Sequence, residues 1–261
     1  MEKIRISAVS YLNTVPFTHG IRHSEIFKDV SLSLDIPSVC AQKLINKNVD
    51  LGLVPVAALL EIKDYFIVTD YCIGAEGPVQ SVMLMSNVPL HEIKFIYLDY
   101  QSKTSVLLNR ILAANFWKLN VEWLDSEPGY EEKIEGNTAA VIIGDRVFTN
   151  RNKYPYQYDL AEEWKKFTGL PFVFAVWAST SELSQDFIQL FNKALDFGLK
   201  NKTAALKEWK NEIPSDLNAF DYLENSISYN LNDEKKKAMK LFLSYAIELD
   251  RAKIITEKFS S

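Results

Sequence analysis

The chain has 261 residues, of which 48% are hydrophobic, so it can bury one large core or the cores of two domains of about 100 to 150 residues each. Its formal net charge of -5, without a basic block, argues against a nucleic-acid or acidic-membrane surface, because such surfaces need clustered Lys and Arg. Cys40 and Cys72 are too few for a disulfide framework or a zinc site. We predict two reduced, buried thiols, with one disulfide as the alternative.

The sequence predicts neither an export signal at the N-terminus nor a membrane helix. The N-terminus enters an apolar strand at once, without an export signal ahead of it, and no apolar run approaches the roughly 18 residues of a membrane helix. We therefore expect a cytoplasmic protein that binds a small molecule and no nucleic acid or membrane. Its oligomeric state is open.

In chain order, the first third alternates strands with helices. The expected elements are strand 4–9, helix 15–27, strand 30–36, helix 39–47 capped by Ser38, strand 50–54, helix 57–61 and strand 66–73. The middle third repeats the pattern, with strand 95–98, helix 104–116, strand 121–123, helix 131–135, strand 139–143 and a further helix over 156–164. Helices are expected from about residue 182 onward. Strands separated by helices predict mostly parallel α/β sheets.

Two long apolar strands, at 81–85 and 172–178, divide this pattern. They suggest two sheets joined by two hinge strands, with a discontinuous first domain (1–86 and 179–261) and an inserted second domain (87–178). This layout resembles the two-domain type II periplasmic-binding-protein-like fold, whose ligand cleft lies between the domains. Fold alone does not name the ligand.

The segment from Ser10 to Thr14 follows the first strand and precedes the first helix, where open α/β sheets place their ligands. Thr14 is open between capping the helix and contacting ligand. Asn13 lies one place too early for the preferred cap, because Pro16 follows, and is a stronger ligand candidate. Ser81 is the first polar group beyond a Gly-Pro turn, and a backbone-bonded hydroxyl is its alternative.

Two further segments end strands of the inserted domain. A turn containing Ser102, Thr104 and Ser105 begins a helix whose free amides favour an anion, with N-capping by Ser102 as the alternative. Gly144 allows close backbone approach, and Asp145 is expected to cap a helix or touch ligand, with capping favoured. The expected substrate-binding residues are Ser10, Tyr11, Thr14, Ser38, Ser102, Thr104, Ser105, Gly144 and Asp145.

The histidines predict no metal site. His19 and His23 lie four apart on one helix face, but the sequence around them lacks a third ligand, and His91 is remote. Nucleotide-binding, dinucleotide-binding and serine-hydrolase motifs are also missing, so neither a redox cofactor nor a hydrolytic triad is supported.

Several ordered motifs carry a family resemblance. They are SYLNTVP at 10–16, GPVQSV at 77–82, SKTS at 102–105, IGD at 143–145, DLAEEW at 159–164 and GLPFVFAVW at 169–177. Together they closely resemble chorismate dehydratase, the family that catalyses the first step of the futalosine route to menaquinone. The resemblance covers about residues 4 to 180, and the C-terminal helices match in character alone.

The resemblance implies a cofactor-independent lyase that converts chorismate into 3-[(1-carboxyvinyl)oxy]benzoate and water. The family's functional Asn and Ser carry onto Asn13 and Ser81, which we take as catalytic. Gln80 and Lys103 stand where Arg is often expected, which leaves open any salt bridge to substrate.

The motif positions offer amide and hydroxyl groups without an obvious general base. We therefore hypothesise that the substrate's enolpyruvyl carboxylate removes the ring proton while Asn13 and Ser81 position the substrate. The alternatives are a non-catalytic small-anion binding protein for transport or sensing, and the 1,4-dihydroxy-6-naphthoate-forming enzyme of the same route. The latter is associated with a Ser-Pro-Cys-Pro-Asn-Asp opening that this sequence lacks.

Overall fold

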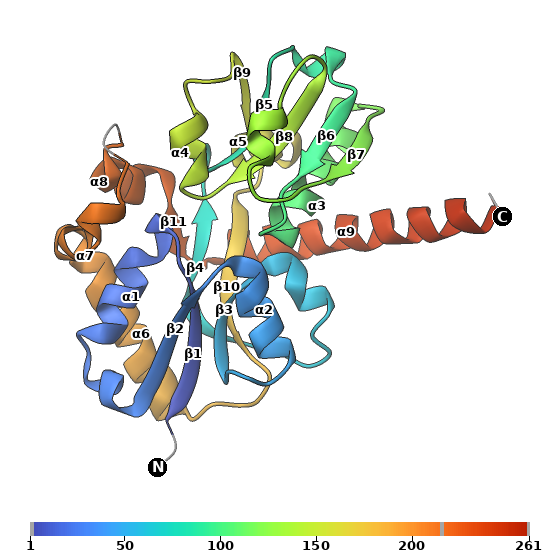
Figure 1. The fold of residues 1–261 in the computed structure, drawn as a ribbon. Coiled ribbons are helices and arrows are strands. Elements are labelled where there is room, and N and C mark those ends of the chain that lie inside the picture. Colours follow the sequence, from blue (N-terminus) through green and yellow to red (C-terminus); the bar gives the residue numbers. More distant parts are fainter. Residues whose placement is uncertain (1–2, 215–216, 260–261) are drawn as a thin grey trace.

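The computed structural model describes residues 3–214 and 217–259, with side chains to residue 251. Residues 1–2, 215–216 and 260–261 of the expected first domain lie outside the described part. The described residues form two sheets flanked by helices, one in each lobe of the molecule (Figure 1).

The first sheet combines parallel and antiparallel strands. In spatial order its strands are β11 (Ser228–Asn230), β4 (Phe66–Ala75), β10 (Phe172–Ser179), β3 (Leu51–Pro55), β1 (Ile4–Val9) and β2 (Val30–Asp35). β1 pairs in parallel with β2 and β3, whereas β10 runs antiparallel to β3 and β4. The carboxyl end of β1 leads into the SYLN segment, whose Leu12 N–H bonds Asp145 of the other lobe.

The second sheet has the order β7 (Glu122–Asp125), β6 (Phe95–Leu98), β8 (Thr138–Ile143), β5 (Val82–Ser86) and β9 (Tyr156–Asp159). β6 is parallel to β7 and β8, and β5 is antiparallel to β8 and β9. The helix expected over 156–164 was wrong in its first part, because 156–159 extends as an edge strand beside β5. The sequence also failed to predict β11.

Helices and short helical turns cover both sheets. The α-helices are α1 (Val15–Arg22), α2 (Pro37–Ile45), α3 (Lys103–Ile111), α4 (Arg146–Asn150), α5 (Leu160–Thr168), α6 (Gln185–Lys200), α7 (Lys202–Trp209), α8 (Ala219–Asp221) and α9 (Asp233–Phe259). The 3-10 and π-helical segments are η1 (Leu12–Thr14), η2 (Glu25–Asp29), η3 (Val56–Leu60), η4 (Leu90–Glu92), η5 (Leu112–Trp117), η6 (Tyr130–Lys133), η7 (Lys210–Glu212) and η8 (Tyr222–Ser226).

The boundaries of α1 and α2, which flank the first strands, differ from the sequence prediction. α1 ends at Arg22, and the residues predicted to continue it form η2. α2 begins at Pro37, one residue before the expected cap Ser38, and Ile36 is its N-cap residue. Pro suits a first turn, whose amides have no helical partner, so Ser38 lies inside the helix and does not cap it.

Side-chain alternation along β5 and β8 buries both faces of the second sheet. Leu84 and Val141 belong to the main hydrophobic core, while Met83 and Ile142 belong to a smaller cluster on the opposite face. Strands with two buried faces read as continuous apolar runs, which is how 81–85 and 139–143 appear in the sequence. Cys40 and Cys72 are buried free thiols, as predicted.

The chain passes between the sheets at residues 76–81 and again at 169–171, between α5 and β10. Each predicted hinge strand directly follows one of these crossings. β5 pairs within the second sheet and β10 within the first, so sheet membership differs from the domain ranges expected from the sequence. We propose that the domain boundaries lie in the two crossings.

Candidate active site in the interdomain cleft

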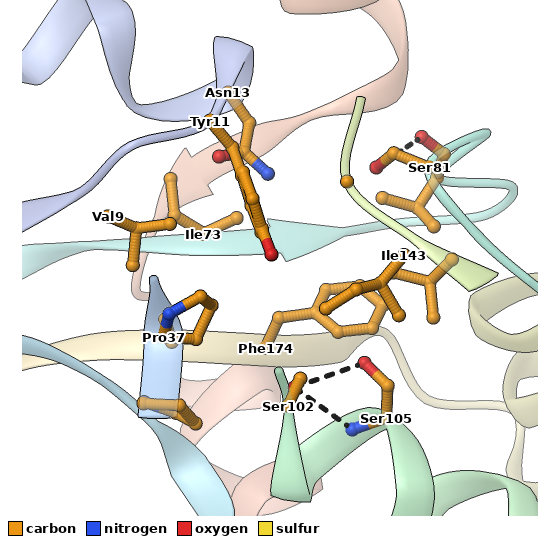
Figure 2. A pocket seen from close by; sticks show the side chains of 15 residues that line it. Val9, Tyr11, Asn13, Pro37, Ile73, Ser81, Ser102, Ser105, Ile143 and Phe174 are labelled. Carbon is orange, nitrogen blue, oxygen red and sulfur yellow. Dashed lines mark hydrogen bonds between the residues drawn. The ribbon is translucent and has the colours of Figure 1, made fainter. Parts of the chain in front are cut away.

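A cavity of about 490 Å³, including its opening, lies where the two sheets face each other (Figure 2). Its lining comes from the ends of β1, β3 and β8, the SYLN segment after β1, the first crossing, the starts of α2, α3 and β5, and parts of β4 and β10. The lining residues are Val9, Tyr11, Asn13, Pro37, Pro55, Ile73, Val79, Ser81, Val82, Ser102, Ser105, Ile143, Gly144, Phe174 and Ala175. The cavity thus gathers segments separated by more than 160 positions.

Both residues expected to be catalytic, Asn13 and Ser81, line this cavity. Four of the expected substrate-binding residues join them: Tyr11, Ser102, Ser105 and Gly144. The remaining five, Ser10, Thr14, Ser38, Thr104 and Asp145, are not among the lining residues.

Each of these five has another structural position. Thr14 is buried, and its Oγ1 donates to Oδ1 of Asn13 (3.1 Å). It therefore supports the side chain of a lining residue. The buried Oγ1 of Thr104 accepts the backbone N–H of Ala57 (3.0 Å). Ser38 lines a separate groove beside α2 and donates its backbone N–H to the Gln101 carbonyl (3.1 Å).

Ser10 and Asp145 are held by backbone contacts. The N–H of Ser10 donates to the Asp35 carbonyl, at 2.9 Å. Asp145 makes no side-chain cap bond to α4, contrary to the favoured expectation. Its carboxylate accepts the N–H of Leu12 from the opposite lobe, at 3.2 and 3.3 Å. This bond links the two walls of the cleft, and burial raises the pKa of Asp145 to about 6.

Ser81 is held by a residue that the sequence did not reveal. The hydroxyl of Tyr222, in η8, donates to Ser81 Oγ at 2.8 Å, and both side chains are buried. Burial raises the pKa of Tyr222, so its phenol stays protonated and acts as a donor. Tyr222 lies 141 positions from Ser81, and the aromatic-rich C-terminal segment carries no motif that marks it.

The backbone next to Ser81 is held in place by several side chains. Gln80 has a φ of 62°, a left-handed conformation that is unfavourable for a residue with a Cβ. Its N–H donates to Oδ2 of Asp159 (2.7 Å), and its side chain bonds Ser226 (2.8 Å) and Arg151 (3.0 Å). Gln80 therefore has a positioning role in the first crossing and is not among the residues lining the cavity.

Tyr11 spans the cleft. Its hydroxyl donates to Oε1 of Gln101 at the start of the α3 segment. Gly144 makes room for its ring: the glycine has a φ of 63°, and a Cβ there would lie 3.0 Å from the Tyr11 ring atoms. Burial raises the pKa of Tyr11, so this phenol also remains protonated at neutral pH.

The start of α3 forms the opposite side of the cavity, as Figure 2 shows with Ser102 and Ser105 below Tyr11 and Asn13. Ser102 caps the helix by accepting the N–H of Ser105 (3.3 Å), which confirms the capping alternative. Its position also leaves the helix N-terminus facing the cavity, where the dipole favours an anion. Lys103 pairs instead with Glu61 (2.6 Å), away from the lining residues.

The cavity is mostly apolar, and its polar groups are uncharged. Among the described residues that line it, none carries a carboxylate, an ammonium, a guanidinium or an imidazole group. Apolar side chains such as Phe174 and Ile143 form the rest of its surface. The arrangement suits a compact, partly apolar ligand whose negative groups can reach hydroxyl donors and a helix N-terminus.

Two α/β lobes joined by two crossings, with a cavity at the strand ends between them, define the periplasmic-binding-protein fold. Solved structures agree with this class. A protein from Archaeoglobus fulgidus superposes with a TM-score of 0.71 at 17% identity, covering 97% of this chain and 98% of that one. A Candida albicans protein described as having the generic periplasmic binding protein fold gives 0.66 at 14% identity, with 94% and 90% covered.

Sequence comparison identifies the family. The model of a family described as menaquinone biosynthesis matches residues 4–248, and the chain belongs to that family. A chorismate dehydratase from Thermus thermophilus is 26% identical over 196 residues, which are 66% of this chain and 68% of that protein. The family match continues through the C-terminal helices, beyond the range of the motifs. Within the part of the chain that the structure describes, no helix is long and apolar enough to cross a membrane.

Proposed function

We propose that the protein is a lyase that dehydrates chorismate to 3-[(1-carboxyvinyl)oxy]benzoate, the first step of the futalosine route to menaquinone. The observation that carries the proposal is that Asn13 and Ser81 line one cavity. Membership of the menaquinone-biosynthesis family and similarity to a chorismate dehydratase support it. A cytoplasmic location stays a prediction from the sequence.

The character of the cavity is compatible with chorismate. This substrate carries two carboxylates and a diene ring, so it needs anion-stabilising groups beside an apolar surface. The start of α3, with Ser102 and Ser105, offers amide and hydroxyl donors, and Phe174 offers a surface for the ring. Because charged side chains are missing from the described lining, recognition would rest on hydrogen bonds and the helix dipole.

The reaction removes a proton from the ring carbon that bears the enolpyruvyl ether and a hydroxyl group from the neighbouring carbon. The electrons of the broken C–H bond become the third double bond of the aromatic ring, and the hydroxide leaves as water after it gains a proton. Tyr11 is the single titratable side chain among the described lining residues, and burial raises its pKa, so it does not serve as the base. We therefore propose, as in the hypothesis from the sequence, that the enolpyruvyl carboxylate of the substrate accepts the proton.

In this mechanism the protein acts by positioning and by hydrogen bonding. Asn13 and Ser81 hold the conformer in which the carboxylate reaches the ring proton, and they stabilise the departing hydroxyl. Tyr222 donates to Ser81 and thereby fixes the direction in which the serine hydroxyl points. Tyr222 is a positioning residue, since it is not among the residues lining the cavity.

The test is to incubate purified protein with chorismate and follow both substrate and product by chromatography with mass detection. We expect turnover by the wild type and a large loss in Asn13→Ala and Ser81→Ala. Ser38→Ala is the matched control, because Ser38 lies in the neighbouring groove and its bond to Gln101 uses the backbone N–H. Chorismate binding without turnover would instead indicate a binding protein, and near wild-type turnover by Asn13→Ala would remove that residue from the mechanism.

A further inference from the structure

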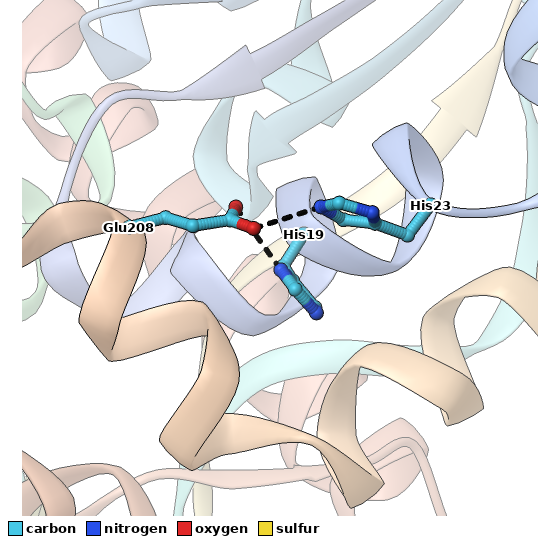
Figure 3. A group of neighbouring side chains, drawn as sticks. All are labelled: His19, His23 and Glu208. Atoms are coloured by element: carbon cyan, nitrogen blue, oxygen red, sulfur yellow. Dashed lines mark hydrogen bonds and ion pairs between the residues drawn. The ribbon is translucent and has the colours of Figure 1, made fainter.

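Outside the cleft, three potential metal ligands from two helices lie together on the first lobe (Figure 3). His19 and His23 project from the last turn and end of α1, and Glu208 projects from α7. Nδ1 of His19 lies 3.1 Å from Oε2 of Glu208, and Nε2 of His23 lies 2.8 Å from Oε1. The ligand atoms of all three residues lie within 4.8 Å of one another.

We propose that His19, His23 and Glu208 bind a divalent transition-metal ion of the Zn²⁺ class. Two imidazoles and one carboxylate are a donor set that such ions accept, with water completing the coordination. The third ligand that the sequence around the two histidines lacks is supplied from about 185 positions away. Spacing along the chain therefore did not predict the site.

The distances fit a tetrahedral ion after modest adjustment. Metal–ligand bonds of about 2.0 to 2.2 Å place neighbouring tetrahedral ligand atoms about 3.3 Å apart. The two histidine–glutamate separations, 3.1 and 2.8 Å, are close to that value but end on different oxygens of the Glu208 carboxylate, and the three ligand atoms together lie within 4.8 Å of one another. Rotation of His23 and Glu208 can complete the geometry, because both side chains are nearly half exposed.

The packing around His19, the buried member of the cluster, restricts the position of its side chain. The His19 ring is 6% exposed and stacks on Phe197 of α6, with ring centroids 6.1 Å apart and planes at 9°. α1 also packs closely on α6, since a Cβ on Gly20 would lie 2.0 Å from the Ala194 carbonyl oxygen. One ligand is thus fixed in place while two exposed ligands can close on the ion, which favours binding with little rearrangement.

An ion at this position would tie α7 to α1. α7 leads into the C-terminal segment that contains η8, and Glu208 links it to α1 here through one contact to the buried His19 and one to the half-exposed His23. Exposed ion pairs contribute little to stability, whereas metal coordination can contribute several-fold more. We therefore expect the bound ion to raise the thermal stability of the chain, independently of whether it catalyses a reaction.

The experiment measures Zn²⁺ binding to chelator-treated full-length protein by isothermal titration calorimetry, with thermal unfolding recorded at each stoichiometry. The expected result is one ion per chain and a raised melting temperature. His23→Ala and Glu208→Gln should each weaken binding by at least about tenfold and abolish the stabilisation. Both replaced side chains are exposed, so the variants should fold, which circular dichroism can verify.

His91→Ala is the matched control. It also removes one histidine, but from η4, where the side chain is 81% exposed and outside the cluster. It should bind Zn²⁺ like the wild type. Co²⁺ titration adds a spectroscopic readout, because tetrahedral coordination by the wild type should give visible absorption that the two cluster variants lack. Absence of stoichiometric binding by the wild type, or unchanged binding by folded His23→Ala and Glu208→Gln, would overturn the proposal.

Discussion

Replacing Tyr222 with phenylalanine tests whether the hydroxyl of a buried residue behind the cavity controls turnover. The substitution removes the O–H that donates to Ser81 Oγ at 2.8 Å and keeps the ring, which packs edge-on against Phe148 with centroids 5.1 Å apart. A hydrogen bond of this kind contributes about 1 kcal/mol, which corresponds to about a fivefold change in rate if it is used fully in the transition state. We therefore expect kcat to fall about fivefold, with a smaller change in KM.

A double-mutant cycle separates this effect from a general loss of stability. If Tyr222 acts through Ser81, then Tyr222→Phe should reduce kcat much less in a Ser81→Ala background than in the wild type, provided that residual turnover is measurable. The assay is initial-rate formation of the enolpyruvyl benzoate from chorismate for all four proteins.

Tyr154→Phe provides the control for losing a buried tyrosine hydroxyl. Its hydroxyl donates to the Glu131 carbonyl within the second lobe, away from the cavity lining. This variant should lose stability while keeping its kcat. Equal losses of kcat in Tyr222→Phe and Tyr154→Phe, or additive effects of the Tyr222 and Ser81 changes, would refute the positioning role.

Three other substitutions probe the walls of the cleft. Gly144→Ala should destabilise the fold by about 1 to 2 kcal/mol, because Gly144 has a left-handed φ of 63°, and should raise KM by displacing Tyr11. Gly136→Ala is its control, since Gly136 has a φ of 52° with open space around it and its substitution should lower stability alone. Equal KM values for the two variants would contradict this prediction. Ser102→Ala removes a helix cap that contributes about 1 kcal/mol to stability, so it should lower the melting temperature and also raise KM. An unchanged melting temperature would count against the cap. Burial raises the pKa of Asp145 from 3.8 to about 6, so the native state holds a proton that the unfolded chain releases in this range. Its contribution to stability is present below pH 3.8 and is lost as pH rises through about 6. Between pH 4 and 7 the free energy of unfolding, measured in denaturant titrations, should therefore fall less in Asp145→Asn than in the wild type, with a difference of no more than about 3 kcal/mol. Parallel pH profiles of the two proteins would exclude this coupling.

The sequence predicted those parts of the fold and site that depend on local pattern. β1 has the predicted bounds because its apolar residues end where the polar SYLN segment begins. A helix start near Thr104, with Ser102 as the alternative cap, was predictable because a serine before an amphipathic helix satisfies free amides at short range. β9 was missed because its four residues, Tyr156–Asp159, become a strand by pairing with β5, a contact that local pattern does not encode.

Long-range partners decide what the remaining candidates do. Asp145 follows a buried strand and precedes a helix, so local rules predict a cap, yet its carboxylate bonds Leu12, which is 133 positions away in the chain. The hydroxyl of Ser81 accepts a bond from Tyr222 and the buried His19 contacts Glu208, and both partners belong to the C-terminal part of the chain. A single sequence can indicate that a serine or a histidine belongs to a site, but its hydrogen-bond or metal-binding partner is known only from the tertiary fold. The C-terminal segment, which had the weakest sequence motifs, therefore supplies the contacts that most directly test both proposals.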